Sequence, residues 1–133
     1  MTGVQTCALP ICEDLVKIGK DAVEGTYFST HASADSLDSR VRQFVDVYRK
    51  RFNGKTPDAM AMLGYDSAMI LADAMKRAGT TDGQKVRDAL AVTKDFAGVS
   101  GNITIDGKRD ATKPMVILQI KGGEFKLVET INP

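Results

Sequence analysis

Three side chains of the kinds that form a nucleophilic triad lie near one another early in the chain. Ser29, His31 and either Asp35 or Asp38 supply a hydroxyl, an imidazole and a carboxylate. In a triad the histidine takes the proton of the serine and the carboxylate orients the histidine, so the three groups must meet in space. Nothing that flanks Ser29 resembles the turn that exposes a catalytic serine. The alternative is that His31 lies in a loop exposed to water and has no catalytic role. We therefore predict that the protein is not an enzyme.

Two further motifs are incomplete. The sequence GKT at 54–56 matches the end of a phosphate-binding loop, but arginine stands at position 49, where the full motif has glycine. That motif also opens a helix, whereas this one closes a helix and is followed by Pro57. In the acidic turn at 106–110, Lys108 and Arg109 stand where a calcium loop needs oxygen ligands. We therefore expect no cofactor and no bound metal.

The composition limits the partners and the class of protein. The 133 residues fit one domain at most, with 43% hydrophobic and 26% charged residues, as in soluble globular proteins. Eighteen basic and 17 acidic residues give a net charge of +1, which excludes the cationic surface that nucleic acid requires. No apolar run is long enough for a membrane span. One histidine and two cysteines are too few for a histidine/cysteine metal site.

The first twelve residues, MTGVQTCALPIC, differ from the rest. They contain both cysteines and no charged residue, whereas the next segment, EDLVKIGKD, contains five charged residues. They lack the basic start and the long apolar stretch of a secretory signal. A lipoprotein signal is disfavoured because Ile11 is too bulky to precede the modified cysteine. The string resembles a translated sequencing-adapter remnant, and we predict that residues 1–12 are a non-native leader.

Strand and helix patterns alternate through the first half of the remaining chain. The β-forming run at 26–30 predicts a strand. Apolar residues at spacings of three and four predict a helix over 37–52, which ends in a basic turn and Asn53-Gly54. The apolar run at 59–63, which Gly64 follows, predicts a strand buried on both faces as in a parallel sheet.

The second half begins with helices and ends in strands. Helices are predicted over 66–78 and 82–93, the first of them burying Ala68, Leu71, Ala72 and Met75. Alternation at 102–105 and the two apolar runs around the turn Lys121-Gly122-Gly123-Glu124 predict a β-meander that ends in a hairpin. This order of elements indicates an α/β protein.

An ordered series of segments resembles the leucine/isoleucine/valine-binding family of periplasmic solute receptors. The longest is FVDVYRKRFNGKTPDAMAMLGYDSAMILADAMKRA at 44–78, and similar segments are GTYFST, VRDAL, FAGVSG, ITIDG and PMVIL. Together they extend the resemblance over nearly all of residues 13–133. The resemblance implies a partial type I periplasmic-binding-protein fold, with two lobes of parallel sheets flanked by helices.

The resemblance also implies how this C-terminal piece is divided. Residues 13–35 would end the second lobe, 36–56 would form a helix and a crossover, and 57–95 would complete the first lobe. Residues 96–133 would return across the hinge and form the hairpin. Because neither lobe has its full sheet, we expect residues 13–133 alone to be unstable or to aggregate through unpaired strand edges.

The function that the resemblance implies is binding without chemistry. The parent protein would be the periplasmic, monomeric solute-binding component of an ABC importer, although this chain shows no export signal. It would close its lobes on a branched-chain or related amino acid and deliver it to membrane permeases. A ligand-sensing regulator of the same fold and a fragment of an α/β enzyme are the alternatives.

The resemblance leaves three candidate ligand-binding residues, since the family's main ligand-gripping loops lie in the missing upstream part. Cleft ligands lie at the carboxyl ends of strands in α/β proteins. Met60 matches by position an apolar pocket residue that is often aromatic in related chains, and Tyr65 follows the predicted strand. His31, after the strand at 26–30, is the third. Core packing of Met60 and a solvated Tyr65 hydroxyl at a helix start are the alternatives without a ligand.

Overall fold

The computed structural model describes residues 13–133, and the predicted leader at 1–12 lies outside the described residues. The first part of this range is mainly helical, with one strand, and the second part consists of strands. The elements are α1 (Glu13–Gly19), the 3-10 helix η1 (Lys20–Val23), β1 (Tyr27–Thr30), α2 (Ser39–Arg51), α3 (Ala59–Ala78), α4 (Gly83–Ala91), β2 (Phe96–Gly98), β3 (Gly101–Ile105), β4 (Ala111–Thr112), β5 (Met115–Lys121) and β6 (Glu124–Ile131).

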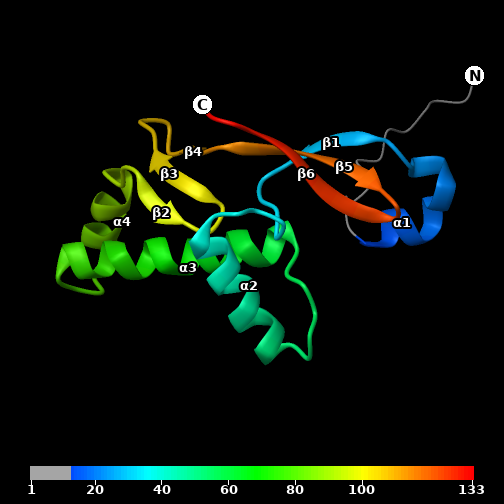
Figure 1. The fold of residues 1–133 in the computed structure, drawn as a ribbon. Helices are drawn as coiled ribbons and strands as arrows, with labels where there is room; N and C mark the ends of the chain where they lie inside the picture. The colour runs from blue at the N-terminus through cyan, green and yellow to red at the C-terminus, as the bar shows by residue number, and fades with distance from the viewer. Residues whose placement is uncertain (1–12) are drawn as a thin grey trace, which may run out of the picture.

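The elements form two bodies that lie side by side (Figure 1). The hairpin body contains α1, η1 and a sheet in the order β1-β5-β6, and the helical body contains α2, α3, α4 and a sheet in the order β2-β3-β4. Every strand pair within the described residues is antiparallel. The described residues therefore contain no pair of parallel strands, although the resemblance implies parallel sheets.

The hairpin body is built around β5. Its side chains alternate between the two faces, so Val116, Leu118 and Ile120 are buried while their neighbours are more exposed. The turn to β6 uses Gly122 and Gly123, whose φ angles of 62° and 74° suit glycine. The predicted hairpin is confirmed, although its second strand extends to Ile131.

Helix α2 confirms the helix predicted over 37–52, with a later start. Asp38 caps it by accepting a hydrogen bond from the backbone N–H of Arg40 at 2.8 Å. Hydrogen bonds from Arg40 lower the pKa of the Asp38 carboxyl, which keeps the cap ionised. The helix ends where Asn53 and Gly54 turn into the left-handed region, with φ angles of 52° and 81°.

The prediction of a strand at 59–63 is wrong, because these residues form the start of helix α3. The chain is helical without interruption over Ala59–Ala78, because Asp58 caps its start and accepts from the Ala61 N–H at 2.7 Å. Alanine, methionine and leucine are strong helix formers, so the residue types of this short apolar run favour a helix. Gly64 lies inside the helix, where it costs about 1 kcal/mol relative to alanine, and does not end the element.

The buried face of α3 also differs from the prediction. Met62, Asp66, Ile70 and Ala74 recur every four residues and are buried. Ala68, Leu71 and Ala72, which were predicted to face inward, are exposed, and Met75 is half-buried. Helix α3 therefore carries a second apolar face that no described element covers.

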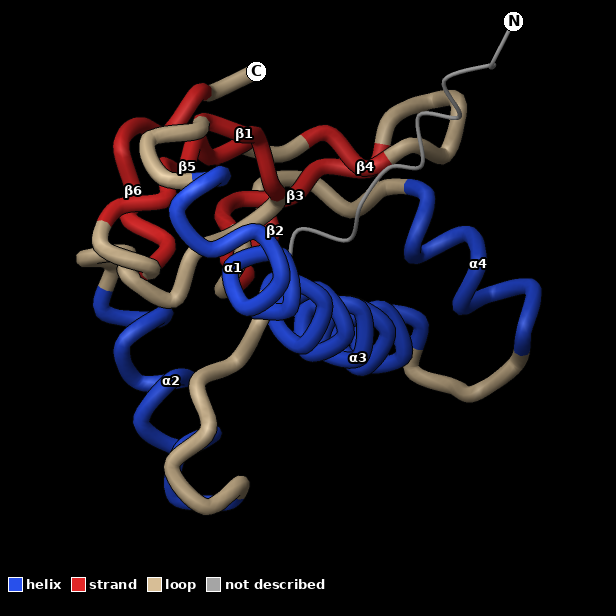
Figure 2. The backbone as a smooth tube through the Cα atoms, turned by 90° about the vertical axis from the view of Figure 1, so that its right-hand side faces the viewer, coloured by secondary structure: helices blue, strands red, loops and turns tan. Residues whose placement is uncertain are grey.

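The helical body places α2 and α4 on opposite sides of α3, as Figure 2 shows in a view nearly along the α3 axis. The predicted helix over 82–93 and the strand at 102–105 are confirmed as α4 and β3. Arg77 joins α3 to the end of α4, because its guanidinium donates to the Thr93 hydroxyl at 2.8 Å and to the Ala89 carbonyl. The sequence patterns do not predict α1, η1, β2 or β4.

Candidate functional site

Two segments cross between the bodies. Residues 31–38 connect β1 to α2, and residues 113–114 connect β4 to β5 (Figure 1). The side-chain nitrogen of Lys113 donates to the carbonyl of His31 at 2.6 Å and to the carbonyl of Pro114 at 3.0 Å. One ammonium group thus holds the two crossing segments together.

A cleft of about 510 Å³ lies between the bodies beside the first crossing segment. The hairpin body contributes both apolar and charged side chains to it, the latter including Glu124 and Lys126. The edge-to-face pair of Phe28 and Phe125, with ring centroids 5.4 Å apart, belongs to this wall. The crossing segment contributes Ser33, Ala34 and Asp35. The helical body contributes the start of α3, including Asp58 and Ala59.

The start of α3 contributes the partial positive charge of a helix N-terminus to the cleft, next to the carboxylate of its cap residue Asp58. The N–H groups of a first helical turn lack intrahelical partners, and the aligned peptide dipoles favour an anion there. In α3 the cap residue Asp58 takes the Ala61 N–H with its side chain and the Met62 N–H with its carbonyl. The N–H groups of Ala59 and Met60 belong to the same turn. The Asp58 carboxylate already lies at this helix start, so an anionic group there would use the N–H groups of Ala59 and Met60.

Asp66 fixes α3 against the turn between β2 and β3. Its carboxylate is 2% exposed and accepts from the N–H groups of Val99 at 2.7 Å and Ser100 at 2.8 Å. Gly98 is required beside it, since a Cβ on that residue would lie 2.7 Å from a carboxylate oxygen. Burial lowers the pKa of Lys113, and the negative charge of Asp66 opposes that shift. The pKa of Arg40 is raised mainly by its hydrogen bond to Asp38, and Asp66 adds to this effect.

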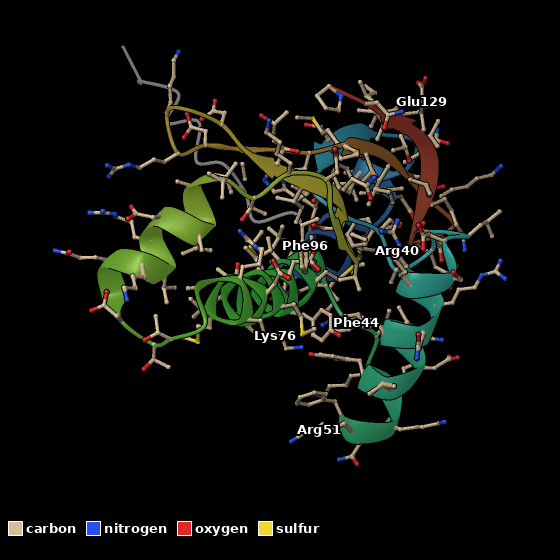
Figure 3. All side chains as sticks on the ribbon, turned by 90° about the vertical axis from the view of Figure 1, so that its left-hand side faces the viewer. Arg40, Phe44, Arg51, Lys76, Phe96 and Glu129 are labelled. Carbon is tan, nitrogen blue, oxygen red and sulfur yellow. The ribbon has the colours of Figure 1, made fainter. Side chains whose placement is uncertain are left out.

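A separate hollow of about 560 Å³, here called the aromatic hollow, lies between α2, α3 and β2. Figure 3 shows Arg40, Phe44 and Arg51 along α2, and Phe96 on the strand side of α3. Phe44 packs on Tyr65 with ring centroids 4.8 Å apart. These two rings belong to the lining, which is mostly apolar.

The structure separates the three predicted ligand residues. Met60 lies in the first turn of α3, directly after the cleft residue Ala59, and is 63% exposed. His31 is exposed at the start of the first crossing segment, two positions before Ser33. Tyr65 is 42% exposed and lines the aromatic hollow instead of the cleft. Because 59–63 is helical, the strand-end argument for Met60 and Tyr65 does not apply, and the helix start takes its place.

Asp58, Asp66 and Lys113 are not among the residues predicted from the sequence. A signal existed for Asp58, because aspartate after proline and before a run of helix formers is a typical cap. A lone aspartate among apolar residues, as at Asp66, indicates a buried partner, since an unpaired buried charge is costly. For Lys113 the sequence holds no such signal, because its partners are backbone carbonyls.

Two general features of the described residues bear on the class of site. No three His, Cys, Asp or Glu side chains within residues 13–133 are grouped as metal ligands. In the same range, no helix combines the length and the apolar character needed to cross a membrane.

Two bodies joined by adjacent crossing segments, with a cleft between them, are the arrangement that the comparisons with known proteins assign to one family. The chain belongs to the periplasmic binding protein family, whose model matches residues 3–124 and so includes part of the predicted leader. It has the type I fold of that family in part, as the sequence analysis predicted.

Individual relatives agree with this assignment. The chain is 28% identical over 108 residues to a Leu/Ile/Val-binding protein homologue of Brucella abortus (strain 2308). The aligned region covers 81% of this chain and 28% of that protein. The structure of a leucine-binding protein from Thermotoga maritima has a TM-score of 0.81 and 40% identity, over 92% of this chain and 35% of that chain. That of the branched-chain amino acid transporter substrate-binding protein LivJ from Streptococcus pneumoniae, in complex with isoleucine, has a TM-score of 0.80 and 28% identity over the same shares. The chain spans about a third of the proteins it matches.

Proposed function

We propose that this chain is the C-terminal part of the solute-binding component of an ABC importer, which captures a branched-chain or related amino acid by closure of two lobes. The observation that carries the proposal is the cleft between the bodies, which is lined by the start of α3, by the first crossing segment and by the apolar side chains of Phe28, Leu118 and Phe125. The longer protein is called the complete receptor below. Its permease partners, its periplasmic location and its monomeric state are parts of the same proposal.

The chemistry of the cleft fits an amino acid with an apolar side chain. The positive end of α3 suits the α-carboxylate of the ligand. Phe28, Leu118 and Phe125 provide the apolar surface that an aliphatic side chain needs. The upstream part of the receptor would supply the groups that hold the α-amino group. Met60 would contact the ligand side chain, while His31 and Tyr65 remain predicted contacts for which the described geometry offers less support.

The two bodies correspond to parts of the two lobes. We propose that the hairpin body, with residues 13–30 and 115–131, belongs to the second lobe. The helical body would belong to the first lobe. This division agrees with the one predicted from the sequence except for β2, β3 and β4. These strands lie beside α3 and would therefore belong to the first lobe, not to the return across the hinge.

Calorimetry of the complete receptor tests this function directly. Titration with leucine, isoleucine and valine should give saturable binding, and isobutylamine, which lacks the carboxylate, should give none. Isovalerate, which lacks the amino group, distinguishes an amino acid receptor from a receptor for simple carboxylates. Absence of binding to leucine, isoleucine, valine and related amides would contradict the ligand class and leave the fold unaffected.

A Met60→Ala substitution tests the predicted pocket residue. We expect the affinity for leucine to fall about 5- to 30-fold, because the lost apolar contact contributes about 1–2 kcal/mol. Met69→Ala is the matched control, since Met69 lies on the same helix but lines the aromatic hollow. Equal affinities of the two variants would show that Met60 is not in the binding pocket.

A ligand-sensing regulator with the same fold is the second candidate. The same cleft would serve it, but closure would signal to a partner domain instead of a permease. Genes for a permease and an ATPase beside the receptor gene, together with an export signal on the complete receptor, favour transport. Turnover of a bound compound by the complete receptor would instead establish the enzyme alternative.

A further inference from the structure

The two crossing segments are joined by one side chain. Lys113 Nζ contacts the carbonyl oxygen of His31 at 2.6 Å and that of Pro114 at 3.0 Å. His31 and Lys113 are 82 positions apart in sequence and lie in different crossing segments. A lysine ammonium has three donors, so it can serve two carbonyls at once. These contacts are called the Lys113 bridge below.

The surroundings of Lys113 favour these carbonyls over an ion pair. The side chain is half-buried, and this burial lowers the pKa of the amine. The negative charge of Asp66 has the opposite effect and raises that pKa. Within residues 13–133, Lys113 forms no ion pair within 4.0 Å. Its two hydrogen bonds therefore go to the backbone that must bend when the bodies move.

We propose that Lys113 is a positioning residue whose bridge makes the two crossing segments bend as a unit and so sets how readily the lobes close. The inference rests on the proposed function, since it concerns closure around the same cleft. His31 begins the segment that carries Ser33 and Ala34 into the cleft wall, so the bridge also fixes the position of that wall. A hinge that is ordered before the ligand arrives loses less conformational entropy on closure.

The test compares three lysine variants of the complete receptor that carries one dye on each body. Asp21→Cys in η1 and Gln84→Cys in α4 provide exposed attachment sites, and residues 13–133 contain no native cysteine. Lys113→Met removes the donors at similar length, and Lys113→Arg keeps charge and donors. Lys108→Met, in the exposed turn before β4, is the matched control.

We expect Lys113→Met to broaden the distribution of dye distances without ligand and to weaken leucine binding about 3- to 10-fold. Lys113→Arg should restore both quantities in large part, and Lys108→Met should leave both unchanged. If Lys113→Met does not fold, as judged by circular dichroism, Lys113→Gln replaces it, because its amide is too short to reach both carbonyls.

A lower melting temperature with an unchanged distance distribution and affinity would overturn the proposal, since Lys113 would then only stabilise the fold. The distance distribution without ligand also separates the two proposals. If the receptor binds no amino acid, the proposed function fails, while the distances still decide the role of Lys113.

Discussion

Replacing Asp66 by alanine should lower the free energy of unfolding of the complete receptor by about 3 kcal/mol. The carboxylate is almost fully buried and accepts from the N–H groups of Val99 and Ser100. Hydrogen bonds to a charged group contribute about 1.5–3 kcal/mol, and the substitution leaves two buried donors without partners. Urea denaturation followed by circular dichroism measures the change, with Asp88→Ala as the exposed control, for which we expect at most about 0.5 kcal/mol.

Gly98→Ala provides an independent check on the same contact. A Cβ at this position would lie 2.7–2.8 Å from the Asp66 carboxylate, so the substitution should cost about 1–3 kcal/mol in the native background. In the Asp66→Ala background the space is open, and the cost should fall. The double-mutant cycle should therefore show a clear coupling energy. Purely additive effects would mean that Asp66 and the β2–β3 turn do not meet as described.

Residues 13–133 on their own should show no sharp cooperative unfolding transition. The three-stranded sheet of the hairpin body leaves one edge of β1 and one edge of β6 unpaired. The second apolar face of α3, with Ala68, Leu71 and Ala72, is also uncovered. Too little surface is buried to offset the entropy of ordering this chain. Scanning calorimetry and sedimentation of the isolated segment measure the outcome.

A control separates instability from aggregation. Val128 lies on the edge strand β6 and is 52% exposed, so Val128→Lys should reduce association between edges. The transition should remain broad in this variant, because the missing sheet is not restored. A monomeric segment with a sharp melt would contradict the expectation and would also weaken the proposed division into two partial lobes.

The sequence predicted best where local signals agree with one another. Helix α2 has an apolar stripe, an aspartate cap and a glycine stop, and the β5–β6 hairpin has two β-forming runs around two glycines. The run at 59–63 lacks such agreement, since a short apolar stretch fits a buried strand and a buried helix alike. Alanine, methionine and leucine, the residue types in this run, are all strong helix formers, and this propensity predicts its structure better than the apolar pattern does.

The candidate site was only partly accessible from sequence. The sequence predicts Met60 at the end of a strand, whereas it lies in the first turn of a helix beside the cleft. Tyr65 packs with Phe44, and this contact depends on how α2 crosses α3, which no local pattern specifies. Asp66 and Lys113 act on groups far away in sequence, so their roles follow from tertiary structure alone.

The order of elements along the chain has a consequence for synthesis on the ribosome. The whole helical body is inserted between β1 and its neighbour β5, and Gly25 and Gln119, which meet in the hairpin body, are 94 positions apart. At about 5–20 residues per second, β1 emerges roughly 5–20 s before β5. All elements of the helical body are synthesised during that interval. Within residues 13–133, the hairpin body thus cannot pair β1 until β5 has been synthesised, after the whole helical body.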